Sequence, residues 1–198
     1  MESSDAAWIG GYIVDYNELA RIAVENGAAK ATVIPVERIV LSAAFRDICK
    51  SNGCGNYGRC WMCPPVVGQI DVLMDQVRGY SHGVLYQTIA QIEDSFDLEG
   101  MSAGSARHAA LSRKIRDALK PVLGKDAMYL TCGGCHGCET CAKKDGLPCR
   151  NPASAMASME SCGIDVYNTT KGTGLSYTNG QNTVTYFGIA LFREESHV

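Results

Sequence analysis

The sequence predicts an α/β (or α+β) protein, with a single compact domain over residues 1–198, a mixed sheet and two cysteine-rich loops at about 49–65 and 132–152. Short β-branched runs alternate with helix-forming segments along the chain, which favours this class. One segment in the second half has an apolar face long enough for a major helix. Hydrophobic residues make up 46% and charged residues 20% of the chain, which is typical of a globular domain that buries a core.

The first half of the chain is predicted to begin with a helix. Asn17–Glu25 contains good helix formers, Asn17 is a suitable N-cap, and Gly27 follows where a helix would end. β-branched and apolar runs then predict further elements. These are strands at 31–34, 38–41 and 83–89 and a helix at 71–77.

The second half contains the strongest helix prediction, Ser105–Leu123. Its alanines, with Ile115 and Leu119, recur at helical spacing, and Pro121 lies near its end. Three further elements and one turn complete the prediction. They are strands at 127–131 and 182–192, a short helix at 152–159, and a hairpin turn at 177–180 before the last strand.

Charge and hydropathy exclude several classes of function. The formal net charge is -3 and the chain has no basic run of the kind that nucleic-acid binding needs. No apolar stretch approaches the ~18 residues of a membrane span. The first residues, 1–5, are acidic and polar, without the features of a secretory signal. We therefore expect a soluble, cytoplasmic protein without a nucleic-acid partner.

Cysteine usage is the most informative feature of the sequence. Nine of the ten cysteines fall into two groups, and Cys162 stands apart. In a reducing compartment, clustered cysteines are metal ligands or catalytic thiols more often than disulfides. The first group is Cys49, Cys54, Cys60 and Cys63, and the second is Cys132, Cys135, Cys138, Cys141 and Cys149.

The second group has the spacing of an iron–sulfur site. Its C-x2-C-x2-C run is similar to the ligand run of bacterial ferredoxins, although Cys149 is more distant than the last ferredoxin ligand. Glycines 133, 134 and 137 disfavour a regular helix and allow the loop to approach a bulky centre. Zinc is the alternative, but it usually takes two separated C-x2-C pairs. The spacing therefore favours a [4Fe–4S] cluster on Cys135, Cys138, Cys141 and Cys149, with Cys132 in reserve and Cys149 able to serve the first group instead.

The first group is less specific. Cys49, Cys54, Cys60 and Cys63 would together hold one [4Fe–4S] cluster or one zinc ion. Pro64 and Pro65 follow the last cysteine, much as a proline follows a ligand cysteine in ferredoxins. Cys60 is the weakest candidate because it directly precedes Trp61, which favours burial, although its spacing to Cys63 favours shared ligation.

Several separated motifs, in order, resemble the DUF2284 family of predicted metal-binding proteins. They are Cys49-x4-Cys54 with Cys63-Pro64-Pro65, the segment 91–101, Cys135-x2-Cys138-x2-Cys141-x7-Cys149, and Ser158-Met159-Glu160-x2-Gly163-Ile164-Asp165. The resemblance extends over most of the chain, from the first cysteine group to the last strand.

The resemblance implies a ligand set of three cysteines in the first group and four in the second. Cys60, Cys132 and Cys162 lie outside the family pattern. Three thiolates on a [4Fe–4S] cluster would leave one iron open, and Cys60 would close that position here. The implied ligands are Cys49, Cys54 and Cys63, then Cys135, Cys138, Cys141 and Cys149.

Other polar residues have simpler interpretations. His136 lies inside the cysteine run, where tuning of the cluster is favoured over ligation. Lys143 and Lys144 would offset thiolate charge or guide an acidic redox partner. The acidic residues between 93 and 99 are best explained as a solvated loop.

Three functions remain open from the sequence. The first is electron transfer through two [4Fe–4S] clusters to or from a redox partner protein. The second is an enzyme whose first cluster has an open iron for a small-molecule substrate, with a polar pocket that could include Arg46, Arg59 or Tyr57. The third is a zinc-binding interaction module. The ligand spacing favours the first, and neither the partner nor the oligomeric state is predicted.

Overall fold

The computed structural model describes residues 6–195, which form five helices and a five-stranded mixed sheet beside a two-stranded sheet. This confirms the predicted mixed α/β class. The strands are β1 (Ala6–Ile9), β2 (Tyr12–Asp15), β3 (Lys30–Pro35), β4 (His82–Gln91), β5 (Met128–Thr131), β6 (Ala157–Ser158) and β7 (Thr183–Phe192). The helices are α1 (Tyr16–Glu25), α2 (Phe45–Lys50), α3 (Ile70–Arg78), α4 (Leu98–Leu123) and α5 (Val166–Thr170).

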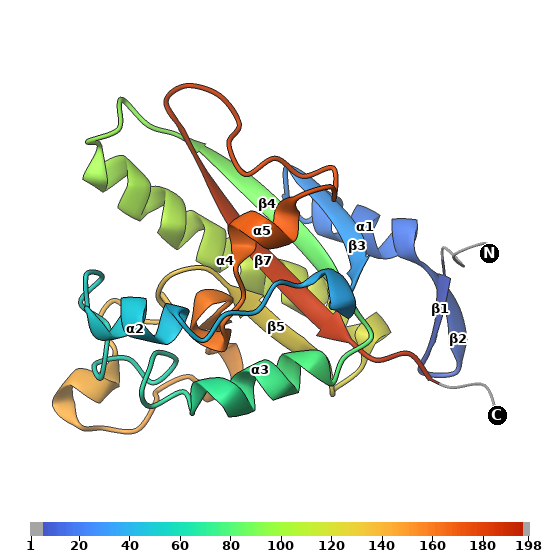
Figure 1. Cartoon of the computed structure of the whole chain (residues 1–198), viewed down its shortest axis with the longest axis horizontal. Helices are drawn as coiled ribbons and strands as arrows, with labels where there is room; N and C mark the ends of the chain where they lie inside the picture. The colour runs from blue at the N-terminus through green and yellow to red at the C-terminus, as the bar shows by residue number, and fades with distance from the viewer. Residues whose placement is uncertain (1–5, 196–198) are drawn as a thin grey trace.

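The main sheet has the strand order β3-β4-β7-β5-β6 (Figure 1). Its centre is the long antiparallel pair of β4 and β7, which are matched from His82 opposite Phe192 to Gln91 opposite Thr183. β5 runs antiparallel to β7, whereas β6 runs parallel to β5. The last pair therefore has both of its carboxyl ends at the same edge of the sheet.

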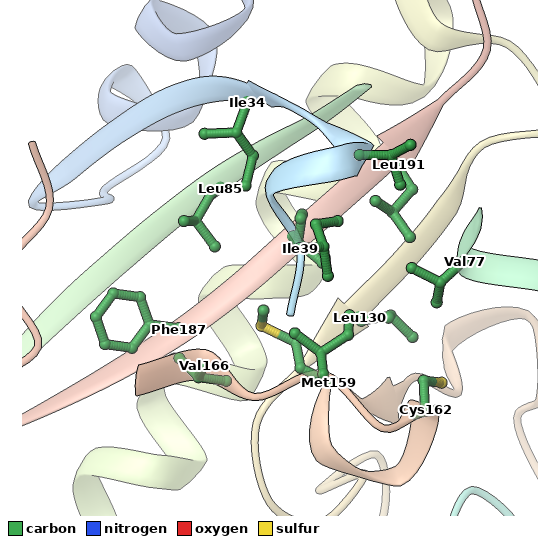
Figure 2. Packing of buried hydrophobic residues seen from close by; sticks show 14 of the residues in the cluster. Ile34, Ile39, Val77, Leu85, Leu130, Met159, Cys162, Val166, Phe187 and Leu191 are labelled. Carbon is green, nitrogen blue, oxygen red and sulfur yellow. The ribbon is translucent and has the colours of Figure 1, made fainter. Parts of the chain in front are cut away.

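Each face of the sheet buries its own hydrophobic cluster, because side chains alternate between faces along a strand. Val84 and Tyr86 of β4 point to the face that α1 and α4 cover. Leu85, between them, points to the opposite face. There it joins Met159 and Cys162 from the chain after β6 (Figure 2). The sheet is thus the middle layer of the molecule.

The strand predicted at 38–41 is wrong. Residues Val36–Arg38 form a 3-10 turn, and only Leu41 makes an isolated bridge, to Ile164. Val40 explains the difference, because its N–H donates to the Thr169 hydroxyl and its carbonyl accepts from Asp165 N–H. The backbone of this segment is therefore satisfied by the chain around α5 and not by a neighbouring strand.

Predictions near the second cysteine segment also need correction. The helix predicted at 152–159 is limited to the 3-10 turn Pro152–Ser154, since Ala157–Ser158 pairs with β5 as a strand. The hairpin turn predicted at 177–180 is wrong because β7 pairs with β4 and β5, and α5 is the element before it.

Helix starts were less predictable than helix positions. Asp15, and not Asn17, caps α1 by accepting the Asn17 N–H. α4 begins at Leu98 instead of Ser105, because the Asp97 side chain accepts from Gly100 N–H and caps the helix there. The remaining predicted elements, the helix at 71–77 and the strands at 31–34, 83–89, 127–131 and 182–192, are confirmed within a few residues.

His108 of α4 is a buried titratable group in the core, 1% exposed. Its Nε2 lies 3.0 Å from the Phe187 carbonyl oxygen, which only accepts, so Nε2 carries the proton. Nδ1, 2.8 Å from the Thr88 hydroxyl, then accepts from it. Burial lowers the pKa of His108 to about 4.

This burial predicts a pH dependence of stability. The unfolded chain takes up a proton on His108 near its ordinary pKa of 6.5, whereas the folded chain does so only near a pKa of about 4. The stabilisation is therefore complete above pH 6.5 and is lost as the pH falls toward 4, with a total of about 3 kcal/mol. Urea unfolding at both ends of this range should show the loss in the wild type and a smaller loss in His108→Gln.

The comparison of the two proteins removes effects that both share, such as loss of bound metal in acid. Equal pH dependence of the free energy of unfolding in His108→Gln and wild type would contradict the assignment.

Candidate metal centre

The two cysteine segments lie side by side at one end of the molecule, as the teal and light-orange loops in Figure 1 show. The first begins in α2 and continues through turns to Pro65, and the second follows β5. Trp61 joins them, because its Nε1 donates to the Leu147 carbonyl at 3.0 Å and Lys143 Nζ lies 4.5 Å from its ring centroid. Segments some eighty residues apart in sequence therefore form one site.

Two cavities lie within this site. The first cavity, of about 170 Å³, is lined by five cysteines and is here called the five-thiol cavity. Its cysteines are Cys60, Cys135, Cys138, Cys141 and Cys149. A second cavity of about 210 Å³, the three-thiol cavity, is lined by Cys49, Cys54 and Cys63. Asn56 lines both, so the cavities are neighbours.

All eight cysteines predicted from the sequence to be ligands line one of these cavities, but their grouping differs from the order along the chain. Cys60 lines the five-thiol cavity with the second segment, and the other three cysteines of the first segment line the three-thiol cavity. Cys149 lies with its own segment. Cys60 and Cys63, which belong to one short turn, therefore line different cavities.

Cys60 and Cys63 nevertheless remain in contact through a hydrogen bond between their side chains. This bond is the main cause that lowers the pKa of Cys60 to about 5, with help from the backbone N–H groups of Met62 and Cys135 and from the Cys141 side chain. The same bond raises the pKa of Cys63. One proton shared by the pair leaves Cys60 as the thiolate, which is the form that binds metals.

The remaining two cysteines line neither cavity. Cys162 is fully buried in the hydrophobic cluster, as Figure 2 shows, and burial raises its pKa to about 11. Cys132 is half-buried directly after β5, where burial raises its pKa to about 12 and the Ser105 side chain hydrogen-bonds to it. A protonated, buried thiol is chemically inert, so Cys162 has a structural role here.

Arg113 of α4 fixes the second cysteine segment. Its guanidinium donates to the carbonyl oxygens of Cys135, Ser154 (3.1 Å) and Ala109 (3.0 Å). The chain also needs unusual backbone there, since Gly133 has φ +63° and His136 has φ +47°. Arg113 therefore holds a loop without regular secondary structure and places a positive charge beside thiolates.

The structure adds one residue that the sequence analysis missed, Glu160, which lines the three-thiol cavity. Its Oε2 is buried and has no hydrogen-bond partner. Burial raises the pKa of Glu160, while hydrogen bonds from its own N–H, the Ser158 side chain and Gly133 N–H act in the opposite direction. A charged residue in the apolar stretch between Met156 and Ile164 was the available signal.

Other sequence candidates have simple structural roles. His136 is exposed on the five-thiol cavity, with Nε2 3.3 Å from Ser105 Oγ. Tyr57 lines the three-thiol cavity, and Arg46 donates to the carbonyl oxygens of Gly68 and Ser161. The acidic loop caps α4 through Asp97.

Over residues 6–195, no three His, Cys, Asp or Glu side chains are grouped so that they could hold a metal ion, and the thiols instead line the cavity walls. None of the helices in that same range combines the length and apolar character needed to cross a lipid bilayer.

The fold and the thiol-lined cavities define a cysteine-rich α/β protein with the side chains of a metal-binding site. The family model of DUF2284, described as a predicted metal-binding protein, matches residues 32–192. The chain therefore belongs to this family, as the sequence motifs predicted. No curated protein and no solved structure matches it.

The placement of the cysteines predicts how alkylation responds to metal removal. With metal bound, iodoacetamide should modify few thiols. After chelation, Cys54 and Cys138 should react first because both are exposed, and the other cavity cysteines should follow. Cys162 should stay unmodified until the protein unfolds, since it is 0% exposed. Peptide mass mapping measures each site, and modification of Cys162 as fast as Cys138 would contradict its core position.

Proposed function

We propose that this protein binds two [4Fe–4S] clusters and transfers electrons to or from a partner redox protein. One observation carries the proposal: two cysteine segments together line two neighbouring cavities with eight thiols. Cys135, Cys138, Cys141 and Cys149 would hold one cluster, with the Cys60 thiol beside it, and Cys49, Cys54 and Cys63 would bind the other. Each cluster would supply a one-electron carrier at its position.

The size of the cavities supports a cluster more than a single zinc ion. A zinc site draws four ligands to within about 2.3 Å of the ion and leaves no free space between them. Cavities of about 170 and 210 Å³ greatly exceed the ~15 Å³ that one water molecule requires. Thiols spread around such a volume suit a polynuclear centre.

The charges around the five-thiol cavity also support this function. A cluster bound by thiolates is anionic, and the Arg113 guanidinium and Lys144 lie at this cavity or its loop. Exposed Cys138 and Glu139 bring the cavity to the surface, where a partner protein could approach closely. The neighbouring three-thiol cavity, which shares Asn56, would place the second carrier within the same site.

A second candidate function is an enzyme with an open iron in the three-thiol cavity. The specific observation in its favour is that Cys60 lines the other cavity, so three cysteines remain. Tyr57 and Glu160 give that cavity polar side chains for a small-molecule substrate. The two functions share the same cofactors and differ in whether a substrate binds iron directly.

Metal analysis of anaerobically purified protein tests the shared cofactors. We expect iron and sulfide equivalent to two [4Fe–4S] clusters per chain, with broad visible absorbance that reduction bleaches. Cys138→Ser and Cys54→Ser should each lower iron and sulfide by about one cluster, because they line different cavities. Cys162→Ser is the matched control and should keep both clusters, since Cys162 lies in the core. Stoichiometric zinc without sulfide would exclude the proposal.

A further inference from the structure

The three-thiol cavity has one ligand fewer than a fully thiolate-bound [4Fe–4S] cluster needs. Cys60, the nearest further cysteine in sequence, lines the five-thiol cavity instead, and neither Cys132 nor Cys162 lines either cavity. The lining of the three-thiol cavity therefore has no fourth cysteine, which leaves a position for another kind of side chain or for a group from outside the chain.

Glu160 is placed to supply it. It begins the 3-10 turn Glu160–Cys162, one residue after the end of β6, and it lines the three-thiol cavity beside Cys49, Cys54 and Cys63. Four buried side-chain atoms in residues 6–195 lack hydrogen-bond partners. Of these, Glu160 Oε2 is the one that belongs to a residue lining this cavity.

The surroundings of Glu160 hold its carboxyl group in place and leave one oxygen without a partner. The Ser158 side chain and the Gly133 N–H hydrogen-bond to it. The Ser161 hydroxyl, which also lines the cavity, is already committed to the Ser158 carbonyl at 2.7 Å. A buried carboxylate oxygen without a partner is costly unless it is paired or coordinates a metal.

We propose that the Glu160 carboxylate, through Oε2, is the fourth ligand of the metal centre in the three-thiol cavity. The inference rests on the proposed function for the nature of that centre, a [4Fe–4S] cluster. An oxygen ligand binds iron less strongly than a thiolate does, because thiolates are the soft ligands that iron–sulfur centres select. Glu160 thus makes one iron of this cluster exchangeable, while the other three stay fixed by cysteines.

Oxidation with ferricyanide tests the proposal through iron content and EPR. A cluster with one exchangeable iron gives up Fe²⁺ and one electron, which ferricyanide accepts, and [4Fe–4S]²⁺ becomes [3Fe–4S]⁺. We expect wild type to lose about one iron per chain and to show the [3Fe–4S] EPR signal. Glu160→Cys should lose none, because a fourth thiolate replaces the weak ligand. Glu160→Gln should lack that iron on isolation or lose it several-fold faster.

Glu139→Gln is the matched control, since it removes a carboxylate at the five-thiol cavity and should behave as wild type. Cyanide adds an independent measurement that does not depend on Glu160→Gln folding well. It should shift the EPR spectrum of reduced wild type and leave that of Glu160→Cys unchanged.

The outcomes separate this inference from the proposed function. Two intact clusters in wild type, with Glu160→Gln and Glu160→Cys both matching wild type in iron loss and cyanide response, would overturn the role of Glu160 alone. A wild-type protein without iron and sulfide would overturn the clusters and this inference together.

Discussion

The metal centre depends on the parallel pairing of β5 and β6, which consists of only two matched pairs, Leu130 with Ala157 and Thr131 with Ser158. Because the strands are parallel, their carboxyl ends meet at one edge of the sheet, and the long connection between them contains the second cysteine segment. Cys132 leaves β5 at the edge where Met159 and Glu160 leave β6. The Met159 N–H also donates to the Thr131 carbonyl and extends this pairing by one step. The antiparallel β7 strand anchors β5 in turn, so the ten-residue ladder of β4 and β7 supports the whole site.

Polar groups around the site hold an irregular backbone that has few ladder hydrogen bonds of its own. Arg113 donates to the carbonyl oxygen of Cys135 within the second cysteine segment and to that of Ser154 just after it, and the Arg150 guanidinium donates to the Thr140 carbonyl within the segment. Trp61 connects the first segment to the second. These bonds satisfy backbone acceptors that neither helix nor sheet reaches. Because guanidinium groups make several of them, the same contacts place positive charge where thiolates gather.

The sequence predicted most of the fold because its long elements have strong periodicity. The apolar faces of α4 and β7 are clear in the pattern, and the cysteine spacing was sufficient to find all eight cysteines that line the cavities. The predictions for short elements were wrong for a physical reason, because the conformation of a short element depends on residues that are distant in sequence. The strand predicted at 38–41 lost its expected ladder because Val40 bonds to Thr169 and Asp165. The local pattern marks Glu160 only as a charged residue in an apolar stretch. Its importance depends on thiols about a hundred residues earlier in the chain, which only the fold brings to it.

The short spacing between Cys60 and Cys63 was a poor guide to which cavity each thiol lines. Spacing alone favoured one shared centre for these residues, but two residues of a tight turn can point to opposite sides of it. In the structure the two thiols line different cavities while their side chains stay hydrogen-bonded. The placement of the thiols allows one chain to combine a fully thiolate-bound centre with one whose fourth ligand is a carboxylate. Cys60 lines the cavity that already has four other thiols, and its absence from the three-thiol cavity leaves a position that Glu160 can fill.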